Sequence, residues 1–380
     1  MNRMYLDHAA TSPMHPAVID KMMSVMQKDF GNPSSIHAYG REARHILDQS
    51  RTVIADSIGA AQNEIIFTSG GTEADNMALI GTAEAYSSRG KHIITTEIEH
   101  HAVLHAAHYL EKRGFEVTYL SVDAEGRISA EDVKAALRED TILVSVMYGN
   151  NEVGSVQPIA EIGEIVKGHQ AYFHTDAVQA YGLVQIDVKE LNVDLLSVSA
   201  HKINGPKGIG FLYMRDGLKL QSRSIGGEQE RKRRAGTESV PAIAGFAEAV
   251  KMMEADRSKK VKQYGEFKDA MLDVFNRSGL QYEVNGASGQ TLPHVLNVSF
   301  PGTNVESMLV NMDLAGIAVS SGSACTAGSI EPSHVLVAMF GKGSERTKNS
   351  IRFSFGLNNT LEEVTEAAEK TATIVSRLVD

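Results

Sequence analysis

Cys325 is the single cysteine among the 380 residues, and its surroundings favour reaction over packing. It lies in the run Ser-Ser-Gly-Ser-Ala-Cys-Thr-Ala-Gly-Ser over 320–329. A lone thiol cannot form an intrachain disulfide, and free cysteine is normally buried among apolar residues. A thiol on a polar, glycine-containing loop is instead a candidate nucleophile. A loop thiol without a function stays an alternative on this segment alone.

Glycines and hydroxyl residues at 68–76, the run Thr-Ser-Gly-Gly-Thr-Glu-Ala-Asp-Asn, indicate a possible phosphate site. The run follows a predicted strand at 64–68 and opens a predicted helix at 72–87. Glycines let the backbone approach an anion, and the hydroxyls of Ser69 and Thr72 can join the amides of a helix start in holding phosphate. The run is neither a dinucleotide-binding fingerprint nor a Walker A loop, so a capped turn explains it equally well.

Two polar residues follow predicted strands in the middle of the chain. Asp176 comes after the strand at 171–174, and Lys202 comes after the strand at 195–199. Open α/β sheets bind ligands at the carboxyl ends of their strands. Pyridoxal phosphate (PLP) needs a lysine for its Schiff base, a carboxylate for its pyridine nitrogen and a helix start for its phosphate. Asp176, Lys202 and the turn at Gly71 and Thr72 together predict a PLP site.

The elements that must position these residues alternate between strands and helices. Short β-branched runs recur roughly every 25 residues, which is typical of βαβ units and a mostly parallel sheet. The predicted strands are 64–68, 92–96, 116–120, 142–147, 171–174 and 195–199. Apolar residues at helical spacing over 16–30 predict a helix whose methionine stripe packs into the core.

The pattern of predicted strands and helices changes after residue 240. A long charged helix is predicted at about 241–277, followed by strands at 294–300, 317–320 and 351–355 and a final helix at 361–378. A chain of 380 residues exceeds the usual size of a single core, so two domains are expected. The predicted boundary lies near residue 258.

Composition limits the class of protein. The net charge of −10 argues against general affinity for nucleic acid or anionic membranes, and no apolar run reaches the roughly 20 residues that span a bilayer. The first eight residues contain no apolar signal core. A reduced lone thiol fits a cytoplasmic protein.

Ten runs together resemble the NifS/IscS-type cysteine desulfurases of the class-V aminotransferase family, over nearly the whole chain. The matching runs are 5–11 (YLDHAAT), 30–35 (FGNPSS), 68–76 (TSGGTEADN), 99–100 (EH), 150–154 (NNEVG), 176–179 (DAVQ), 199–202 (SAHK), 234–237 (RAGT), 320–326 (SSGSACT) and 350–354 (SIRFS). Ala200 and Gly71 depart from the usual glycine and alanine, and both changes are small.

The resemblance implies an α/β protein with the PLP-dependent transferase fold type I. Its large domain, 13–258, would contain a mostly parallel seven-stranded sheet. A smaller α+β domain, 1–12 with 259–380, would carry the Cys325 loop.

The resemblance also implies the roles of individual residues. The residues implied to bind PLP are Gly71, Thr72, His100, Asn151, Asp176, Gln179, Ser199, His201, Lys202 and, from the partner of a homodimer, Thr237. Lys202 would form the Schiff base and move the Cα proton, while His100 would stack on the ring and act as acid and base. Asp176 would pair with the pyridine nitrogen and Gln179 with the phenolic oxygen. Asn151 and Arg352 would bind the substrate carboxylate, the arginine through a bidentate fork.

In such an enzyme Cys325 acquires a function. Its thiolate would attack the sulfur of L-cysteine, giving L-alanine and a persulfide on a loop that must move to reach an acceptor. The alternatives are a selenocysteine lyase, which would need Cys325 far less, and a non-catalytic PLP-binding sulfur relay. The sulfur could pass to a tRNA thiouridylase or to an iron–sulfur scaffold, and the chain's end at Asp380 leans weakly towards the tRNA pathway.

Two further patterns are weaker. His101, His105 and His108 share a predicted helix, and ordinary surface histidines explain them better than metal ligands, so no metal is expected. The basic run 231–234 precedes the Ala-Gly-Thr of 235–237. This position favours a loop that reaches a neighbouring subunit over direct nucleic-acid binding.

Overall fold

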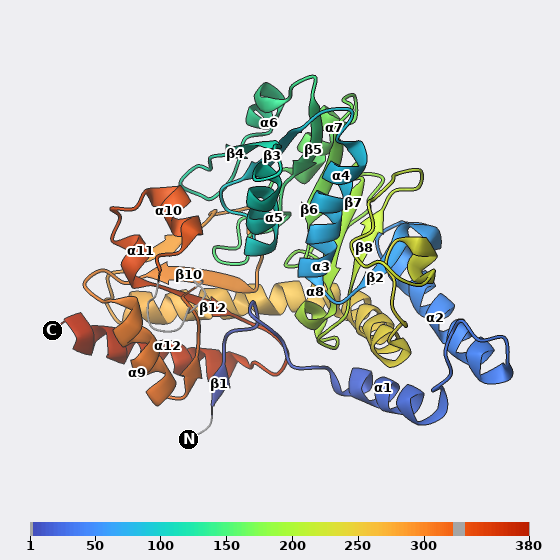
Figure 1. Cartoon of the computed structure of the whole chain (residues 1–380). Coiled ribbons are helices and arrows are strands. Elements are labelled where there is room, and N and C mark those ends of the chain that lie inside the picture. The colour runs from blue at the N-terminus through green and yellow to red at the C-terminus, as the bar shows by residue number, and fades with distance from the viewer. Residues whose placement is uncertain (1–2, 322–330, 380) are drawn as a thin grey trace.

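The computed structural model describes residues 3–321 and 331–379 (Figure 1). Within these residues, seven strands form one sheet in the order β2-β8-β7-β6-β5-β3-β4. The strands are β2 (Ile65–Thr68), β3 (His92–Thr96), β4 (Glu116–Leu120), β5 (Thr141–Ser145), β6 (Tyr172–Asp176), β7 (Leu195–Ser199) and β8 (Gly210–Met214). All neighbours are parallel except at β8, which is antiparallel to β2 and β7. The predicted mostly parallel seven-stranded sheet is confirmed.

Helices cover both faces of this sheet, which explains the continuous apolar strands. Ile65 and Phe67 pack on one face and Ile66 on the other, because neighbouring side chains alternate along a strand. The helices are α1 (Pro16–Lys28), α2 (Ala38–Asp56), α3 (Gly71–Asn76), α4 (Thr82–Tyr86), α5 (His101–Glu111), α6 (Ala130–Ala136), α7 (Ile159–Val166) and α8 (Val240–Arg277). Residues from α3, α4 and α5 form one core with the sheet, and residues from α1, α2, α6, α7 and the first part of α8 form the other.

The single helix predicted at 72–87 is divided. α3 and α4 are joined by a π-helical segment, Met77–Gly81, whose five residues are all buried. The strand β8 is absent from the sequence-based prediction. It follows β7 through residues 200–209, which contain the short helical turn Ala200–Ile203 and Gly208 at φ +79°, rather than through a crossover helix.

The methionine stripe of α1 was predicted to pack into the core, and this prediction is wrong for its outer half. Val18 and Val25 are buried, whereas Met23 and Met26 are 51% and 56% exposed. The apolar stripe is wider than the face that α8 covers.

A smaller unit is built around the antiparallel sheet β12-β10-β9. Its elements are β1 (Met4–Tyr5), β9 (Glu283–Asn285), β10 (Val295–Ser299), α9 (Val305–Leu314), β11 (Ile317–Ala318), α10 (His334–Phe340), α11 (Arg346–Asn349), β12 (Ser350–Ser354) and α12 (Leu361–Val379). Figure 1 shows α8 extending from the large sheet to this unit. The predicted boundary at residue 258 falls inside α8 and stays a prediction. It is supported by a separate core that joins Met4 and Leu6 to residues from Tyr264 onwards.

No helix in the described ranges has the length and apolar character needed to cross a bilayer.

The small unit's core provides a stability test at Phe275, which is fully buried and packs edge-on against Phe300 and Tyr282. Phe275→Ala should lower the free energy of unfolding by about 3–5 kcal/mol, because it removes apolar contacts and leaves a cavity. Leu314→Ala, at a side chain that is 71% exposed, is the control and should change it by less than about 0.5 kcal/mol. Urea unfolding followed by circular dichroism measures both. Equal, small effects would contradict the packing described.

Candidate active site

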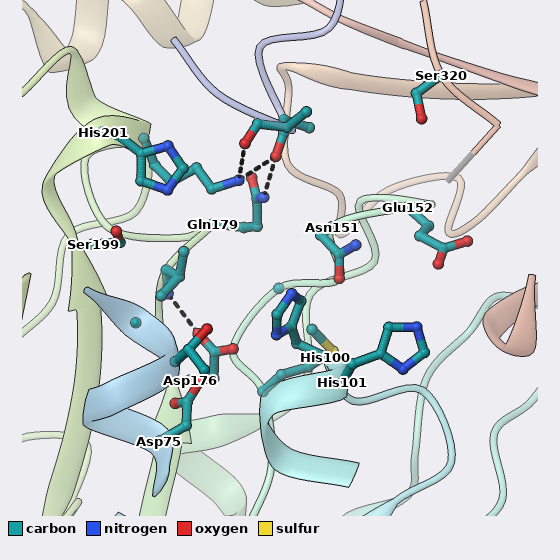
Figure 2. A pocket seen from close by; sticks show the side chains of 18 of the residues that line it. Asp75, His100, His101, Asn151, Glu152, Asp176, Gln179, Ser199, His201 and Ser320 are labelled. Atoms are coloured by element: carbon teal, nitrogen blue, oxygen red, sulfur yellow. Dashed lines mark hydrogen bonds between the residues drawn. The ribbon is translucent and has the colours of Figure 1, made fainter. Parts of the chain in front are cut away.

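The carboxyl ends of the strands open into one cavity of about 370 Å³. Ten of the residues proposed from sequence line it: Gly71, Thr72, His100, Asn151, Asp176, Gln179, Ser199, His201, Lys202 and Arg352. Figure 2 shows the labelled members of this group converging from the large sheet and from the loops above it. Thr237 is exposed and lies outside the lining of this cavity among the described residues. Cys325 lies outside the described residues.

Lys202 is held at the cavity by a short turn that follows β7. The turn, Ala200–Ile203, ends at Asn204, whose left-handed conformation (φ 65°) is one that asparagine tolerates. The Lys202 ammonium donates to the carbonyl oxygens of Ala9 and, at 2.9 Å, of Ala10. The N-terminal segment therefore packs against the lysine that sequence analysis selected.

The pKa of Lys202 is lower than that of a lysine on the surface. Burial, and after it the nearby Arg352 guanidinium, lower the pKa of Lys202 to about 8, while Asp176 and Asp7 act in the opposite direction. A neutral amine is therefore accessible to Lys202 near pH 8, which nucleophilic attack on a carbonyl requires.

Asp176 forms the base of the cavity. It ends β6 and accepts a hydrogen bond of 2.9 Å from the Val178 amide. Burial raises its pKa to about 6, and the Val178 amide and the Lys202 charge act against that rise. Its position at the strand end follows from the buried run that precedes it.

Turn geometry brings the glycine-rich run against the same cavity. A Cβ atom at Gly71 would lie 2.8 Å from Val178 Cγ2, so the close approach of α3 to the Val178 loop requires glycine or a shift of that side chain. Thr72 and Ser199 lie beside it in the lining. His201 is oriented by a 3.0 Å hydrogen bond between its Nδ1 and Thr11 Oγ1.

His100 caps the start of α5 and faces the cavity. Its Nδ1 accepts from the Ala102 amide at 3.1 Å, which fixes this nitrogen as the acceptor. Enclosure in the cavity wall lowers the His100 pKa to about 4, and Lys202 and neighbouring histidines add to the effect. The ring is therefore neutral near pH 7, with its other nitrogen available to carry a proton.

Gln179 is oriented by two neighbours. Its Nε2 donates to the Ala9 carbonyl at 2.9 Å, and its Oε1 lies 3.0 Å from His294 Nε2. These contacts show which atom of the Gln179 amide is Nε2 and which is Oε1. The sequence alone gives no information on this orientation.

Arg352 comes to the cavity from β12, in the small unit. Its Nη2 pairs with Asp7 Oδ1 at 2.8 Å and its Nη1 donates to the Asn151 carbonyl at 2.9 Å. Its Nε is buried and has no hydrogen-bond partner among the residues that the structure describes. A buried donor of this kind is suited to an anionic ligand.

Several lining residues escaped the sequence analysis: Ala9, Ala10, Asp75, His101, Met147, Gly149, Glu152, Val178, Ser320 and His334. Asp75 could have been suspected, because it lies in the 68–76 run beside the phosphate turn. Ser320 and His334 flank the segment that contains Cys325. Ser320 is brought to the rim by a β-bridge to Arg352.

The helix α5 histidines and the basic run have partners within the chain. The His101 ring stacks on His105 and lies 4.7 Å from the His334 ring. Within the described residues, no group of three or more metal-ligating side chains is arranged to hold a metal ion. In the basic run, Arg234 pairs with Glu73 at 2.8 Å and Arg233 donates to the Asn63 carbonyl. These two guanidinium groups are therefore part of the fold.

Residues 4–366 match the family described as aminotransferase class-V. The chain belongs to the class-V aminotransferase family. It is 61% identical over 378 residues to "Putative cysteine desulfurase IscS 1" of Bacillus subtilis (strain 168), with both chains covered completely. It is 47% identical to "Cysteine desulfurase IscS" of Dictyoglomus turgidum, covering 98% of this chain and 95% of the relative.

Solved structures of this class-V family share the fold. The chain matches "NIFS-LIKE PROTEIN" with a TM-score of 0.92 and 35% identity, covering 99% of this chain and all of the other. It matches "SspA in complex with cysteine" with a TM-score of 0.82 and 36% identity, covering 93% and 98% of the two chains. The predicted resemblance to NifS/IscS-type proteins and the predicted fold are both confirmed.

The residues of this class-V member fit PLP. One cavity is surrounded by the buried carboxylate of Asp176, the Lys202 amine of lowered pKa and the turn of Gly71 and Thr72 at a helix start. These groups would suit the pyridine nitrogen, the aldehyde and the phosphate of the cofactor, respectively. The buried Arg352 Nε is a further donor in this cavity, of a kind suited to an anion.

The lowered pKa of Lys202 is testable on the apoenzyme. The amine should become reactive with a midpoint near pH 8 instead of 10.5, because burial and Arg352 disfavour its charged form. Competitive acylation followed by peptide mass spectrometry measures this midpoint. Arg352→Gln should raise it, since the repelling guanidinium is gone. A midpoint near 10.5 in the unmodified chain would refute the electrostatics described here.

Proposed function

We propose that this protein is a PLP-dependent cysteine desulfurase that converts L-cysteine to L-alanine and transfers the sulfur to Cys325 as a persulfide. One observation carries the proposal. A single cavity is lined by two residues suited to the cofactor, Lys202 and Asp176, and by two suited to the substrate carboxylate, Arg352 and Asn151. Ser320 and His334, which lie on either side of the segment that contains Cys325, line the same cavity.

PLP, when bound, would supply the electron sink that lets the Cα proton of the substrate leave. Asp176 would accept the pyridine N–H, and Gln179 would direct its Nε2 to the phenolic oxygen. Thr72, Ser199 and His201, with the amides at the start of α3, would hold the phosphate. Lys202 Nζ would accept and return the Cα proton, and the neutral His100 ring would stack above the site and exchange a proton.

Substrate binding would use the small unit. Arg352 would hold the carboxylate of cysteine through its buried Nε together with one terminal nitrogen, and the Asn151 side chain would complete the contact. The similarity to "SspA in complex with cysteine" supports this substrate.

Sulfur transfer would use Cys325 as the nucleophile. Its thiolate attacks the substrate sulfur, a sulfur–sulfur bond forms, and the bond between Cβ and sulfur breaks. The electron pair remains with the carbon fragment, which is protonated at Cβ and released as alanine. L-cysteine and one enzyme thiol thus give L-alanine and one enzyme persulfide, with no external oxidant.

Cys325→Ala separates binding from transfer. The variant should still bind PLP and cysteine, seen by absorbance, but form no protein persulfide in a mass-spectrometric assay, because the accepting sulfur is gone. Lys202→Ala is the control that should lose the covalent cofactor signal. Unchanged sulfide release from the Cys325→Ala variant with cysteine would remove the nucleophile assignment. Unchanged turnover with selenocysteine alone would instead favour a selenocysteine lyase, and absence of turnover in the unmodified chain would favour a sulfur relay.

We also propose a homodimer in which Thr237 reaches the phosphate site of the partner. Thr237 is exposed and outside its own chain's cavity, while Arg234, three residues earlier, is fixed to Glu73 of α3. Exposed apolar side chains near α1 provide an apolar surface that a second subunit can cover. These side chains are Ile19, Met23, Met26, Phe30, Ile36 and Tyr39.

Hybrid dimers test the contribution of Thr237. Thr237→Ala should weaken PLP binding, because it removes a phosphate donor. A hybrid of one Lys202→Ala subunit with one Thr237→Ala subunit should regain one full-affinity site if Thr237 acts on its partner. Affinity measured at limiting PLP on purified, differently tagged hybrids decides this. If Thr237 acts within its own chain, no site of the hybrid is intact and affinity stays low.

The persulfide would then supply sulfur to an acceptor protein in the cytoplasm. A tRNA thiouridylase and an iron–sulfur scaffold both accept sulfur in this form, and we propose an acceptor of one of these two kinds. Direct nucleic-acid binding is not part of the proposal, since the net charge is −10 and two arginines of the basic run are used within the fold.

A further inference from the structure

A second carboxyl group, Asp75, lies beside Asp176 at the base of the cavity. Asp75 comes from α3 and Asp176 ends β6, and their side chains are neighbours in Figure 2. Asp75 is 1% exposed and Asp176 is 5% exposed. The proposed chemistry uses Asp176 and gives Asp75 no role, although both line the same cavity.

Two buried carboxylates side by side repel each other, so one of them holds a proton unless a cation separates them. His174 of β6 is a basic side chain beside Asp75, with its Nε2 3.6 Å from Asp75 Oδ1. Complete burial lowers the His174 pKa to about 3, so its ring is neutral. His174 is instead held by two hydroxyls, Ser145 at 2.9 Å and Ser197 at 3.0 Å. The pair therefore shares a single negative charge.

Hydrogen bonding decides which member of the pair is charged. Asp176 accepts the Val178 amide and is attracted by the Lys202 ammonium, and both interactions favour its ionised form. Asp75 Oδ1 is buried without a hydrogen-bond partner in the described residues, and burial and the Asp176 charge raise the Asp75 pKa well above its usual range. The Ser197 hydroxyl opposes this rise, while Glu99, also buried, adds to it.

We infer that Asp75 is a positioning residue that holds the shared proton, so that Asp176 is the single anion facing the pyridine nitrogen of the cofactor. This inference rests on the proposed PLP function. A proton on Asp176 instead would remove the negative charge that stabilises the pyridine N–H. Asp75 thus acts through Asp176 and touches neither substrate nor reacting atoms.

Infrared spectroscopy locates the proton. Protein labelled with isotope-substituted aspartate should show, at neutral pH, a carboxylic-acid C=O band that shifts with the label, which separates Asp75 from the buried glutamates Glu99 and Glu152. The band should vanish in Asp75→Asn. It should remain in Asp176→Asn, because burial, the larger cause of the raised Asp75 pKa, is unchanged when the Asp176 charge is lost. A band that remains in Asp75→Asn and vanishes in Asp176→Asn would overturn the inference. Glu99→Gln is the matched control and should leave the labelled band in place.

A second variant keeps the test decisive if Asp75→Asn does not fold. Ser197→Ala retains Asp75 but removes its hydroxyl neighbour, so the same labelled band should move to higher frequency. A labelled band that does not move in Ser197→Ala would overturn the assignment to Asp75.

Cofactor affinity supplies an independent readout. Asp176→Asn should weaken PLP binding by about 10-fold or more, the usual loss for a hydrogen bond to a charged group, and Asp75→Asn should weaken it less. Equal losses would overturn the division of roles. Failure of the unmodified apoenzyme to bind PLP would refute the proposed function, whereas the infrared band would still report where the proton lies.

Discussion

The parallel register of the central sheet is the constraint on which the site depends. Strands β2, β3, β5, β6 and β7 all end at the same edge, because β8, the one reversed strand, lies between β2 and β7 and restores the direction of β2. The residues that follow these strand ends are therefore brought together by the sheet. They need no contacts with one another to form the site. Helices on both faces bury the strands, so a register shift would move apolar side chains out of two cores at once.

A second constraint is the cost of placing charges in this enclosed space. The Lys202 ammonium is repelled by the Arg352 guanidinium and attracted by the Asp176 carboxylate, and burial acts against both the ammonium and the carboxylate. The Asp7 carboxylate offsets part of the Arg352 charge. The positive and negative charges in the cavity thus offset each other. Because of this balance, Lys202 can lose its proton more readily than a surface lysine while the Asp176 carboxylate lines the same cavity.

Much of this arrangement could be predicted from sequence because it depends on local patterns. Asp176 follows an apolar strand and Lys202 follows another, so their common edge could be inferred before any coordinates. The strand β8 was missed, since the prediction relied on the spacing of crossover units, and the connection of residues 200–209 is too short to contain a crossover helix. The outer methionines of α1 were misassigned because periodicity shows that a face is apolar without showing what covers it.

Residues whose role depends on distant partners were beyond this reasoning. The pairing of Asp7 with Arg352 joins two ends of the chain, and no local motif relates them. Asp75 lies on a helix, where an acidic residue normally faces water. Its burial became visible only when α3 was seen packed against β7 and β8.

The division between the two units has a consequence for substrate selection. The large unit supplies Lys202 and Asp176, which suit the cofactor, while β12 of the small unit supplies Arg352, which suits a substrate carboxylate. Arg352 is also joined by a β-bridge to Ser320, next to the segment that contains Cys325. In the proposed function, recognition of the amino acid and delivery of the thiol would therefore depend on the same strand. A shift of β12 relative to the large sheet would misplace both, whereas it would leave the contacts of Asp176 with Val178 unchanged.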